Sequence, residues 1–353
     1  MAGFGPVYVF LTGTAMAKKQ IRLCLTIDVE EEGLFCDKYE RENVTVTNVA
    51  SLKNMEALAR RGYPATLFCA HPVFTDAAAC RILERMRDDF GMEIGAHLHH
   101  WNTPPVVPSP GGKGEQQVLV KSMDHDLVHK KLESLFAAGR AFQSAPLKSF
   151  RMGRWDIHSW IFPMLAEMGV ATDASVRPLF CGPGKANHFD APASPYRMQT
   201  SAGEIFEVPL TTRPLWMGLQ QTVHFLEKTL KFSEGSIAAT VQKWGALAVL
   251  PVYHNMLAMK LFGLHNIFWG GDTLVLAWHS SEMMPGAAPH IQSAAAVTSL
   301  MQRVHSFIDW LEARYDVRGC TLETLRAETA FRAPLKTPSD VPASASVDWL
   351  ADR

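Results

Sequence analysis

The sequence predicts an α/β fold in which parallel strands alternate with helices that cover them. In the first hundred residues, three short apolar segments alternate with two segments of helical periodicity, an order typical of strand–helix–strand units. The length of 353 residues suits one α/β barrel with insertions. Charged residues recur at the ends of the apolar segments, where active sites form in parallel α/β folds.

Hydrophobic periodicity defines the elements of the N-terminal part. We expect strands at residues 21–28, 65–70 and 92–97, and helices at residues 47–61 and 76–90. Each of the two helical segments is followed by a glycine, Gly62 or Gly91, which is a common helix stop. The resulting order predicts parallel strands with helices outside them.

The remaining elements are predicted in the same way. We expect strands at residues 148–151, 170–176, 204–208, 273–278 and 320–322, and helices at residues 124–142, 157–168, 291–315 and 323–331. Residues 216–269 are apolar and helical without a charged motif, which indicates a helical insertion. We therefore expect one domain at residues 20–332, an unstructured leader at 1–19, and a disordered tail at 333–353, which is rich in Pro, Ser, Ala and Asp.

Composition and charge exclude several classes of function. Lys and Arg number 34 against 35 Asp and Glu, so bulk attraction to nucleic acid or to an anionic membrane is not expected. The six cysteines show no C-x-x-C spacing, which favours free thiols in a reducing compartment. No segment has the length and apolar character of a transmembrane helix. We expect a soluble cytoplasmic protein that acts on a small molecule or a glycan; its oligomeric state is not predicted.

A cluster of imidazoles ends the third predicted strand. His97 and His99 are two residues apart, so they point the same way along an extended chain, about 6–7 Å apart at the backbone. The prolines at 104 and 105 prevent the strand from continuing. Imidazole is the commonest protein metal ligand, and it also carries protons near neutral pH. The alternative is a surface loop that happens to be rich in histidine.

Five charged residues share a position at or near the C-terminal end of a predicted strand. They are Asp28, His97, Arg151, Asp173 and His279. In a barrel of parallel strands these ends converge on one face. Charges at such positions are costly unless they are paired or bind a ligand. Satisfied ion pairs, for example between Asp28 and Arg151, are the structural alternative for any one residue, but they explain all five together less well.

Five stretches of the sequence resemble the polysaccharide deacetylases (NodB-homology) among the carbohydrate esterases. They are residues 25–30 (LTIDVE), 93–99 (EIGAHLH), 150–155 (FRMGRW), 173–176 (DASV) and 278–282 (WHSSE). They occur in the order of that family and span residues 21 to about 285. The resemblance implies a distorted (β/α)7–8 barrel and a hydrolase that removes an acyl group, such as acetyl, from an amino sugar or a glycan intermediate. It also implies a divalent metal, zinc ahead of cobalt, nickel or iron.

The resemblance assigns roles to individual residues. Asp28 would be the base and His279 the general acid, and Glu30, His97 and His99 would bind the metal. Arg151 or Arg154 would steady the base, and Asp173 could keep His279 protonated. Trp101 and Trp155 would offer flat faces for a sugar ring, although for Trp155 a place in the core is the favoured interpretation. Glu31, Glu32 and His100 are expected in solvent or in loops.

The sequence departs from the family pattern at the metal site. Val29 follows Asp28 where the family has a second aspartate, so the second acid would be Glu30. Trp101 stands where the family has its second histidine, so the chain would need a compressed H-x-H form with His99. These departures keep two alternatives open. One is a hydrolase of another non-peptide C–N bond, with or without a metal; the other is a non-catalytic carbohydrate-binding relative.

Overall fold

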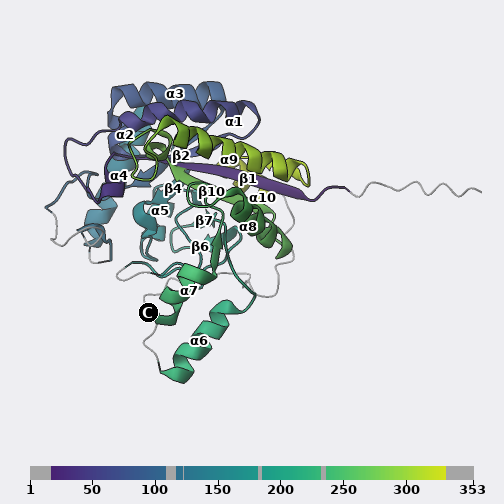
Figure 1. The fold of residues 1–353 in the computed structure, drawn as a ribbon. Helices are drawn as coiled ribbons and strands as arrows, with labels where there is room; N and C mark the ends of the chain where they lie inside the picture. The colour runs from purple at the N-terminus through teal and green to yellow at the C-terminus, as the bar shows by residue number, and fades with distance from the viewer. Residues whose placement is uncertain (1–16, 109–116, 122, 182–184, 232–235, 331–353) are drawn as a thin grey trace, which may run out of the picture.

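A curled sheet forms the centre of the molecule (Figure 1). The computed structural model describes residues 17–108, 117–121, 123–181, 185–231 and 236–330. The predicted tail and residues 1–16 of the predicted leader lie outside the described residues. The start of the described chain is packed against the domain, because the Lys18 ammonium donates to the carbonyl of Glu312 at 2.9 Å.

The sheet has nine strands within the described residues, and its path runs β10-β1-β2-β3-β4-β5-β7-β6, with β11 paired to β1. The strands are β1 (Gln20–Val29), β2 (Ala65–Ala70), β3 (Glu93–Leu98), β4 (Ser149–Met152), β5 (Thr172–Asp173), β6 (Tyr196–Gln199), β7 (Glu204–Glu207), β10 (Thr273–His279) and β11 (Asp316–Gly319). All pairs are parallel except β6 with β7. The predicted α/β fold with parallel strands is confirmed.

The sheet curls into a half-barrel whose edge strands, β10 and β6, do not pair. The chain that follows β7 lies between the two sides. The Leu210 N–H donates to the carbonyl of Val176 at 3.0 Å, and the Val275 N–H of β10 donates to the hydroxyl of Thr211 at 2.7 Å. The barrel is therefore distorted at this side, where a connecting segment replaces a regular strand.

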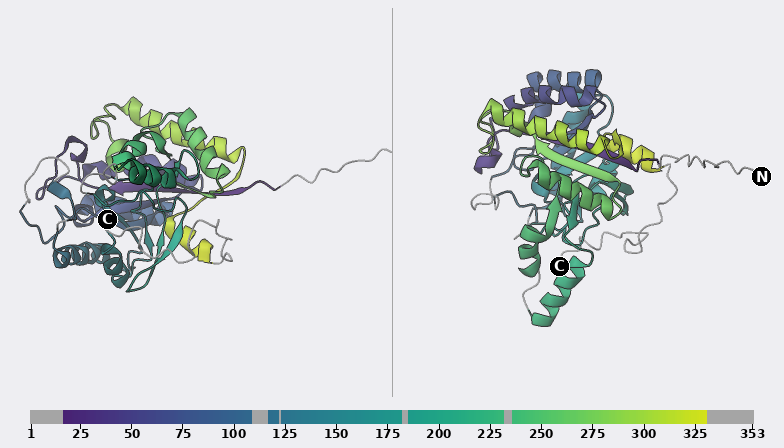
Figure 2. Two further views of the ribbon diagram at one scale, coloured as in Figure 1. Left: turned by 90° about the horizontal axis from the view of Figure 1, so that it is seen from below. Right: turned by 45° about the vertical axis from the view of Figure 1, so that its right-hand side comes forward.

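Helices cover the outside of the sheet (Figures 1 and 2). They are η2 (Thr47–Met55), α1 (Glu56–Arg60), α2 (His71–Thr75), α3 (Ala77–Phe90), α4 (His125–Phe142), α5 (Ile161–Glu167), α9 (Ala294–Glu312) and α10 (Leu322–Ala330). The short 3-10 helices η1 (Leu34–Cys36), η4 (Gly153–Trp155) and η5 (Ser280–Met283) instead follow the carboxyl ends of β1, β4 and β10. Asp76 caps α3 by accepting the N–H groups of Ala78 and Ala79, and Gly91 at φ 63° ends it. The apolar face of α9, from Val297 to Leu311, is buried in the main core.

The described residues between β7 and β10 form three helices and a small two-stranded sheet. These elements are β8 (Thr212–Pro214), α6 (Leu219–Leu230), α7 (Ser236–Gly245), β9 (Ala246–Ala248) and α8 (Met256–Phe268). Strands β8 and β9 pair antiparallel. Helices α6 and α7 project beyond the body of the domain, whereas α8 lies along its flank (Figures 1 and 2).

Several predicted boundaries differ from the structure. The helix expected at 47–61 is mostly 3-10 helix, and the strand expected at 170–176 is reduced to Thr172–Asp173. The last strand is Asp316–Gly319, because residues 320–322 lead into α10 instead. Strand β11 alternates exposed and partly buried residues, so it lacks the apolar run by which buried strands are recognised.

Strand register brings the predicted strand-end residues to one level of the sheet. Asp28 in β1 lies opposite His279 in β10. His97 in β3 lies opposite Arg151 in β4, and Phe150, one residue earlier, lies opposite Asp173 in β5. Because these strands are parallel, the residues meet at the carboxyl edge of the sheet.

Candidate active site

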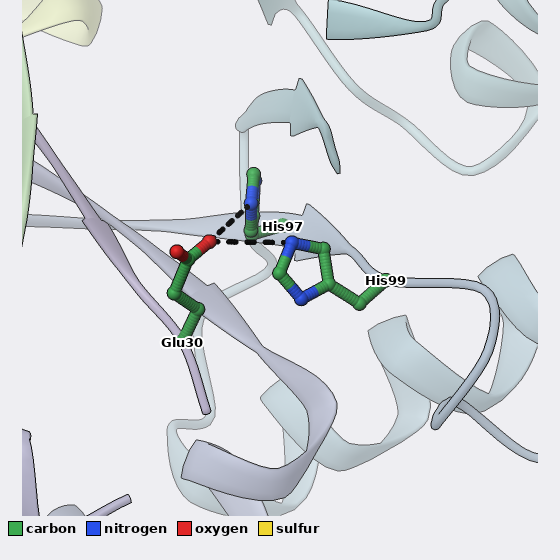
Figure 3. Close-up of side chains that lie close together, drawn as sticks. All are labelled: Glu30, His97 and His99. Carbon is green, nitrogen blue, oxygen red and sulfur yellow. Dashed lines mark ion pairs between the residues drawn. The ribbon is translucent and has the colours of Figure 1, made fainter. Parts of the chain in front are cut away.

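Glu30, His97 and His99 form a buried cluster at the carboxyl edge of the sheet (Figure 3). The Oε2 atom of Glu30 lies 3.3 Å from Nε2 of His97 and 3.2 Å from Nε2 of His99. One ligand atom from each residue lies within 4.8 Å of the other two. The two imidazoles expected on one face of the third strand therefore converge on a carboxylate that comes from the end of β1.

The outer nitrogen of each imidazole has a hydrogen-bond acceptor. Nδ1 of His97 donates to the carbonyl of Arg151 at 2.9 Å, and Nδ1 of His99 donates to Oε2 of Glu31 at 2.8 Å. Both partners can only accept, so each Nδ1 carries the proton. Nε2 of each ring is left facing Glu30 as the nitrogen that can bind a metal, and outer partners orient histidines in this way when they bind metals.

The chemistry of the cluster fits a divalent transition metal. Two imidazole nitrogens and one carboxylate oxygen are the donor set of many zinc sites that keep a position open for water or substrate. The three side chains are buried, with exposed fractions of 2% for His97, 1% for His99 and 3% for Glu30. A buried carboxylate facing two imidazole lone pairs needs a bound cation or extra protons. Glu30, His97 and His99 could therefore hold a metal ion.

Charges around the cluster shift the pKa values of Glu30 and His99. Burial would raise the pKa of Glu30, but His279 and hydrogen bonds from His97 and His99 hold it well below its usual range. Burial would likewise lower the pKa of His99, but Glu31 and Glu30 outweigh this effect and raise it to about 9. A cation that binds at Nε2 of His99 must therefore displace a proton.

Asp28 is held by Arg151 beside the cluster. Nη1 of Arg151 donates to Oδ1 of Asp28 at 2.6 Å, and Nη2 donates to the hydroxyl of Thr26 at 2.9 Å. The guanidinium, which is 1% exposed, also lies over the rings of Phe68 and Trp155, 4.3 and 4.8 Å from their centroids. The arginine is thus fixed on all sides and orients the Asp28 carboxylate.

His279 faces the same space from β10. Its Nε2 lies 3.8 Å from Oδ2 of Asp28 and 3.8 Å from Oε1 of Glu30, while Nδ1 donates to Oε2 of Glu282 at 2.8 Å. Burial would lower the pKa of His279, but Glu30, Glu282 and Asp28 outweigh it and raise the value to about 10. The imidazole is therefore the doubly protonated cation at neutral pH. Its side chain is 26% exposed.

Glu282 is the acid that supports His279. It accepts from Nδ1 of His279 and, at 2.6 Å, from Nε2 of His290. Burial would raise the pKa of Glu282, but His279 and His290 lower it to about 2. The carboxylate is ionised and binds two imidazoles at the exposed side of the cluster.

Comparison with known proteins identifies the fold. No protein-family model matches the sequence. No curated protein matches it either. Among solved structures, the chain is similar to a protein from Mycobacterium smegmatis that has been assigned as a polysaccharide deacetylase, with a TM-score of 0.54 and 16% identity over 89% of this chain and 92% of that one.

This chain has the fold of the polysaccharide deacetylases. A second similar structure is the 4-alpha-glucanotransferase from Thermococcus litoralis, with a TM-score of 0.50 and 10% identity over 88% of this chain and 40% of that one. Enzymes with different reactions thus share this arrangement of strands, so the activity has to be argued from the site.

The structure corrects the assignment of Asp173 within this deacetylase fold. Its carboxylate accepts the N–H of Ser175 at 2.9 Å and the Ser175 hydroxyl at 2.7 Å, and it shares a hydrogen bond with Glu207. Burial raises the pKa of Asp173, which is completely enclosed. The prediction that Asp173 keeps His279 protonated is wrong, because Glu282 is the carboxylate bonded to that imidazole. Glu282 lies in the stretch WHSSE, three residues after His279, and that spacing was the available signal.

Trp101 does not offer a surface to a sugar. Its side chain is 1% exposed, its Nε1 donates to Oε1 of Glu31 at 2.8 Å, and its ring stacks on His99 at a centroid distance of 4.2 Å. The predicted substrate contact at Trp101 is therefore wrong. Glu31 and His100 were expected in solvent or a loop; both lie outside helices and strands, but they are buried rather than exposed to solvent.

The two arginines of the FRMGRW stretch lie in different places. Arg151 binds Asp28, whereas the Arg154 guanidinium lies over the ring of Tyr39, 5.8 Å from its centroid. None of the described contacts joins Arg154 to Asp28. Trp155 is partly exposed, and one side of its ring meets Arg151. Between these residues, Gly153 packs so closely that an added Cβ would lie 2.5 Å from Cδ2 of His99.

Proposed function

We propose that this chain is a metal-dependent hydrolase that removes an acyl group, with acetyl as the simplest case, from an amino sugar or a glycan intermediate. One observation carries the proposal. Glu30, His97 and His99 converge within 3.3 Å beside a carboxylate, Asp28, and a protonated imidazole, His279. A metal-binding group with a base on one side and an acid on the other suits hydrolysis of an amide or an ester.

The metal would be held by Nε2 of His97, Nε2 of His99 and a carboxylate oxygen of Glu30. The donor set favours zinc, with cobalt, nickel or iron as alternatives. When bound, such a cation supplies Lewis-acid activation of water and of the acyl carbonyl. The chain itself supplies the orientation of the ligands, through Glu31 on His99 and the Arg151 carbonyl on His97.

Asp28 would take the proton from the attacking water. Its Oδ1 is bonded to Arg151, which leaves Oδ2 directed toward His279 and the space beside Glu30. Arg151 fixes the plane of the carboxylate through a charge-assisted hydrogen bond. Arg151 is thus the proposed tuning residue for the base, and Arg154 is a candidate for substrate contact at the rim.

His279 would give its proton to the leaving amine or alkoxide. The Nε2–H lies on the side of Asp28 and Glu30, while Glu282 holds Nδ1 and keeps the ring charged. Phe35 packs edge-on against the imidazole at a centroid distance of 4.9 Å and limits its rotation. Trp155, which is partly exposed beside Arg151, is the candidate ring for contact with a sugar.

The compartment is part of the proposal. All six cysteines are free, even though Sγ of Cys24 and Sγ of Cys320 lie only 3.5 Å apart. Free thiols at this distance fit a reducing compartment, which supports a cytoplasmic enzyme.

The test is acetate release from a panel of N-acetyl amino sugars and their oligomers. We expect the wild type to release acetate, and Asp28→Asn to lose roughly 1,000-fold or more in kcat, since general-base contributions reach about 10⁴. The metal content of Asp28→Asn should stay that of the wild type, because its carboxylate is bonded to Arg151 rather than to the cluster.

Two results would contradict the deacetylase proposal. Release of product from a cyclic amide, with no acetate from any sugar, would identify a hydrolase of another C–N bond. Equal inertness of wild type and Asp28→Asn, together with retained binding of a glycan, would identify a carbohydrate-binding protein.

A further inference from the structure

Exposed large apolar side chains are concentrated in one part of the chain. Of the twelve that are exposed among the described residues, eleven lie between residues 215 and 269, and Val106 is the other. Scattered apolar residues are normal on a protein surface, but a concentration of this kind marks an interaction site.

The centre of this surface is helix α8. Leu257, Leu261, Leu264 and Phe268 are spaced by four, three and four residues, so they lie on one face of the helix. Their exposed fractions are 66%, 54%, 39% and 79%. The opposite face is also apolar and is packed inward, with Met259 completely buried. Helix α8 thus presents a full apolar face to the outside while its other face belongs to the core.

The turn after β8 extends the apolar face of α8. Nε2 of His265 donates to the carbonyl of Pro214 at 2.8 Å, and Nε of Arg213 donates to Oδ1 of Asn266 at 2.8 Å. These bonds place the exposed residues after Pro214 beside the C-terminal half of α8. We call the following set the apolar surface: Leu215, Trp216, Met217, Leu257, Leu261, Leu264, Phe268 and Trp269.

The segment that carries the apolar surface is rich in cations. Lys228 and Lys231 are exposed on α6 and at its end, and Lys260 is partly exposed on α8. The one acid of the described residues between 212 and 271 is Glu227, which is buried and accepts the N–H groups of Ile237 and Ala238. In the sequence of residues 212–271, five Lys and Arg stand against two Glu, so the segment carries a net positive charge.

We propose that the apolar surface binds the face of an anionic phospholipid bilayer. Trp, Phe and Leu side chains insert at the boundary between headgroups and acyl chains, and lysines meet anionic headgroups. Helix α8 has 13 residues, which corresponds to about 20 Å of helix, so it lies along the membrane rather than through it. Consistently, the described residues include no helix with the length and apolar character that a membrane span requires.

A second copy of the chain fits this surface less well. Two apolar surfaces brought together would bring two net positive segments together, and like charges oppose association. An anionic bilayer supplies the missing negative charge. The near-zero net charge of the whole chain hides this feature, because it averages a cationic segment with acidic ones elsewhere.

The test is sedimentation of the full chain with vesicles of phosphatidylcholine alone and with 30% phosphatidylglycerol. We expect the chain to bind the anionic vesicles and to bind the neutral ones more weakly. Added salt should decrease the fraction that sediments with the anionic vesicles. The double variant Leu257→Ser/Phe268→Ser should bind at least tenfold more weakly, while Val106→Ser, the matched exposed apolar residue elsewhere, should bind like the wild type. Leu257 and Phe268 are both more than 60% exposed, so the thermal midpoint of the double variant should equal that of the wild type. An unchanged midpoint would show that folding is intact.

Other outcomes overturn the proposal. It fails if the wild type does not sediment with anionic vesicles at moderate salt, or if the double variant binds them equally well. A dimer in sedimentation equilibrium that Leu257→Ser/Phe268→Ser dissociates, without vesicle binding by the wild type, assigns the apolar surface to a second copy instead.

Discussion

Oε2 of Glu31 accepts the Nδ1–H of His99 at 2.8 Å, with both side chains buried. The other oxygen of the same carboxylate accepts Nε1–H of Trp101, whose ring stacks on His99. One acid therefore fixes the tautomer of a proposed metal ligand and also the aromatic ring that limits its movement. The arrangement is that of a carboxylate behind a metal-binding histidine.

Replacing Glu31 should weaken metal binding. In Glu31→Gln the amide has one oxygen, so it can replace the acceptor of His99 or of Trp101 but not of both. His99 would therefore lose either its own hydrogen bond or the fixed position of the indole ring that stacks on it. We expect metal affinity to fall roughly 10- to 100-fold, the usual loss when an outer partner of a ligand is removed. Competition with a chromophoric chelator measures this.

Glu32→Gln is the matched control for Glu31. Glu32 accepts from the hydroxyls of Thr45 and Thr47 and from the Asn48 N–H, and none of these belongs to the cluster. Equal losses of metal affinity in the two variants would show that Glu31 has no special relationship to His99.

Arg151 should be irreplaceable by lysine. A lysine ammonium cannot bind Asp28, Thr26 and the carbonyl of Ala174 together, as the guanidinium does. We expect Arg151→Lys to lower kcat roughly 100-fold, because a displaced base of this kind costs about that factor. Thr26→Val, which removes the hydrogen bonds of the Thr26 hydroxyl to Arg151 and Leu276 but no charge, should have a much smaller effect on kcat. The idea is refuted if the two variants lose the same activity.

Glu282 should set the alkaline limit of activity. A general acid works only while it is protonated, so the rate falls as pH rises through the pKa of His279. Glu282 contributes to the raised pKa of that imidazole. In Glu282→Gln the alkaline limb of the kcat/KM profile should therefore move to lower pH. A profile that keeps its position, with only the amplitude reduced, would argue against His279 as the acid.

His188 should make the fold sensitive to mild acid. Its Nε2–H donates to the carbonyl of Ile157, and its Nδ1 accepts the Arg177 N–H, so both nitrogens are used in the neutral form. Burial lowers the pKa of His188 to about 4, from 6.5 in the unfolded chain. The stability that the fold gains from a neutral His188 is fully present above pH 6.5, and it is lost as pH falls toward 4.

The size of this effect follows from the two pKa values. A difference of 2.5 units corresponds to at most about 3 kcal/mol. His188→Gln can keep a donor and an acceptor without titrating, so its free energy of unfolding should change less with pH over this interval. Urea unfolding at several pH values measures the difference, and parallel curves for the two proteins would disprove it.

The sequence was sufficient for the strands that carry the site. Residues 21–28 and 273–278 are apolar runs because both faces of these strands are buried in a parallel sheet. The position of a charged residue at the end of such a run then predicts where it lies, and Asp28 and His279 do face each other in register. Local pattern and topology agree there, so the prediction succeeded.

The partners of the site residues could not be predicted in the same way. Glu31 is buried because His99 and Trp101, almost 70 positions later in the chain, bring it two N–H donors. Seen alone, it is one of three consecutive glutamates and appears solvent-exposed. The choice of Glu282 over Asp173 likewise depends on which acid the folded chain places at Nδ1 of His279. Such pairings are tertiary, and hydrophobic periodicity contains no information about them.

Metal content measured after chelation and reconstitution tests the central claim most directly. Protein freed of metal, incubated with zinc and passed through a desalting column, should retain one equivalent per chain, as measured by elemental analysis. His97→Ala and His99→Ala should retain almost none, whereas His129→Ala, whose imidazole on α4 lies near the surface residues Glu133 and Glu167, should match the wild type. A wild type that folds normally and retains no more zinc, cobalt, nickel or iron than His97→Ala would contradict the account.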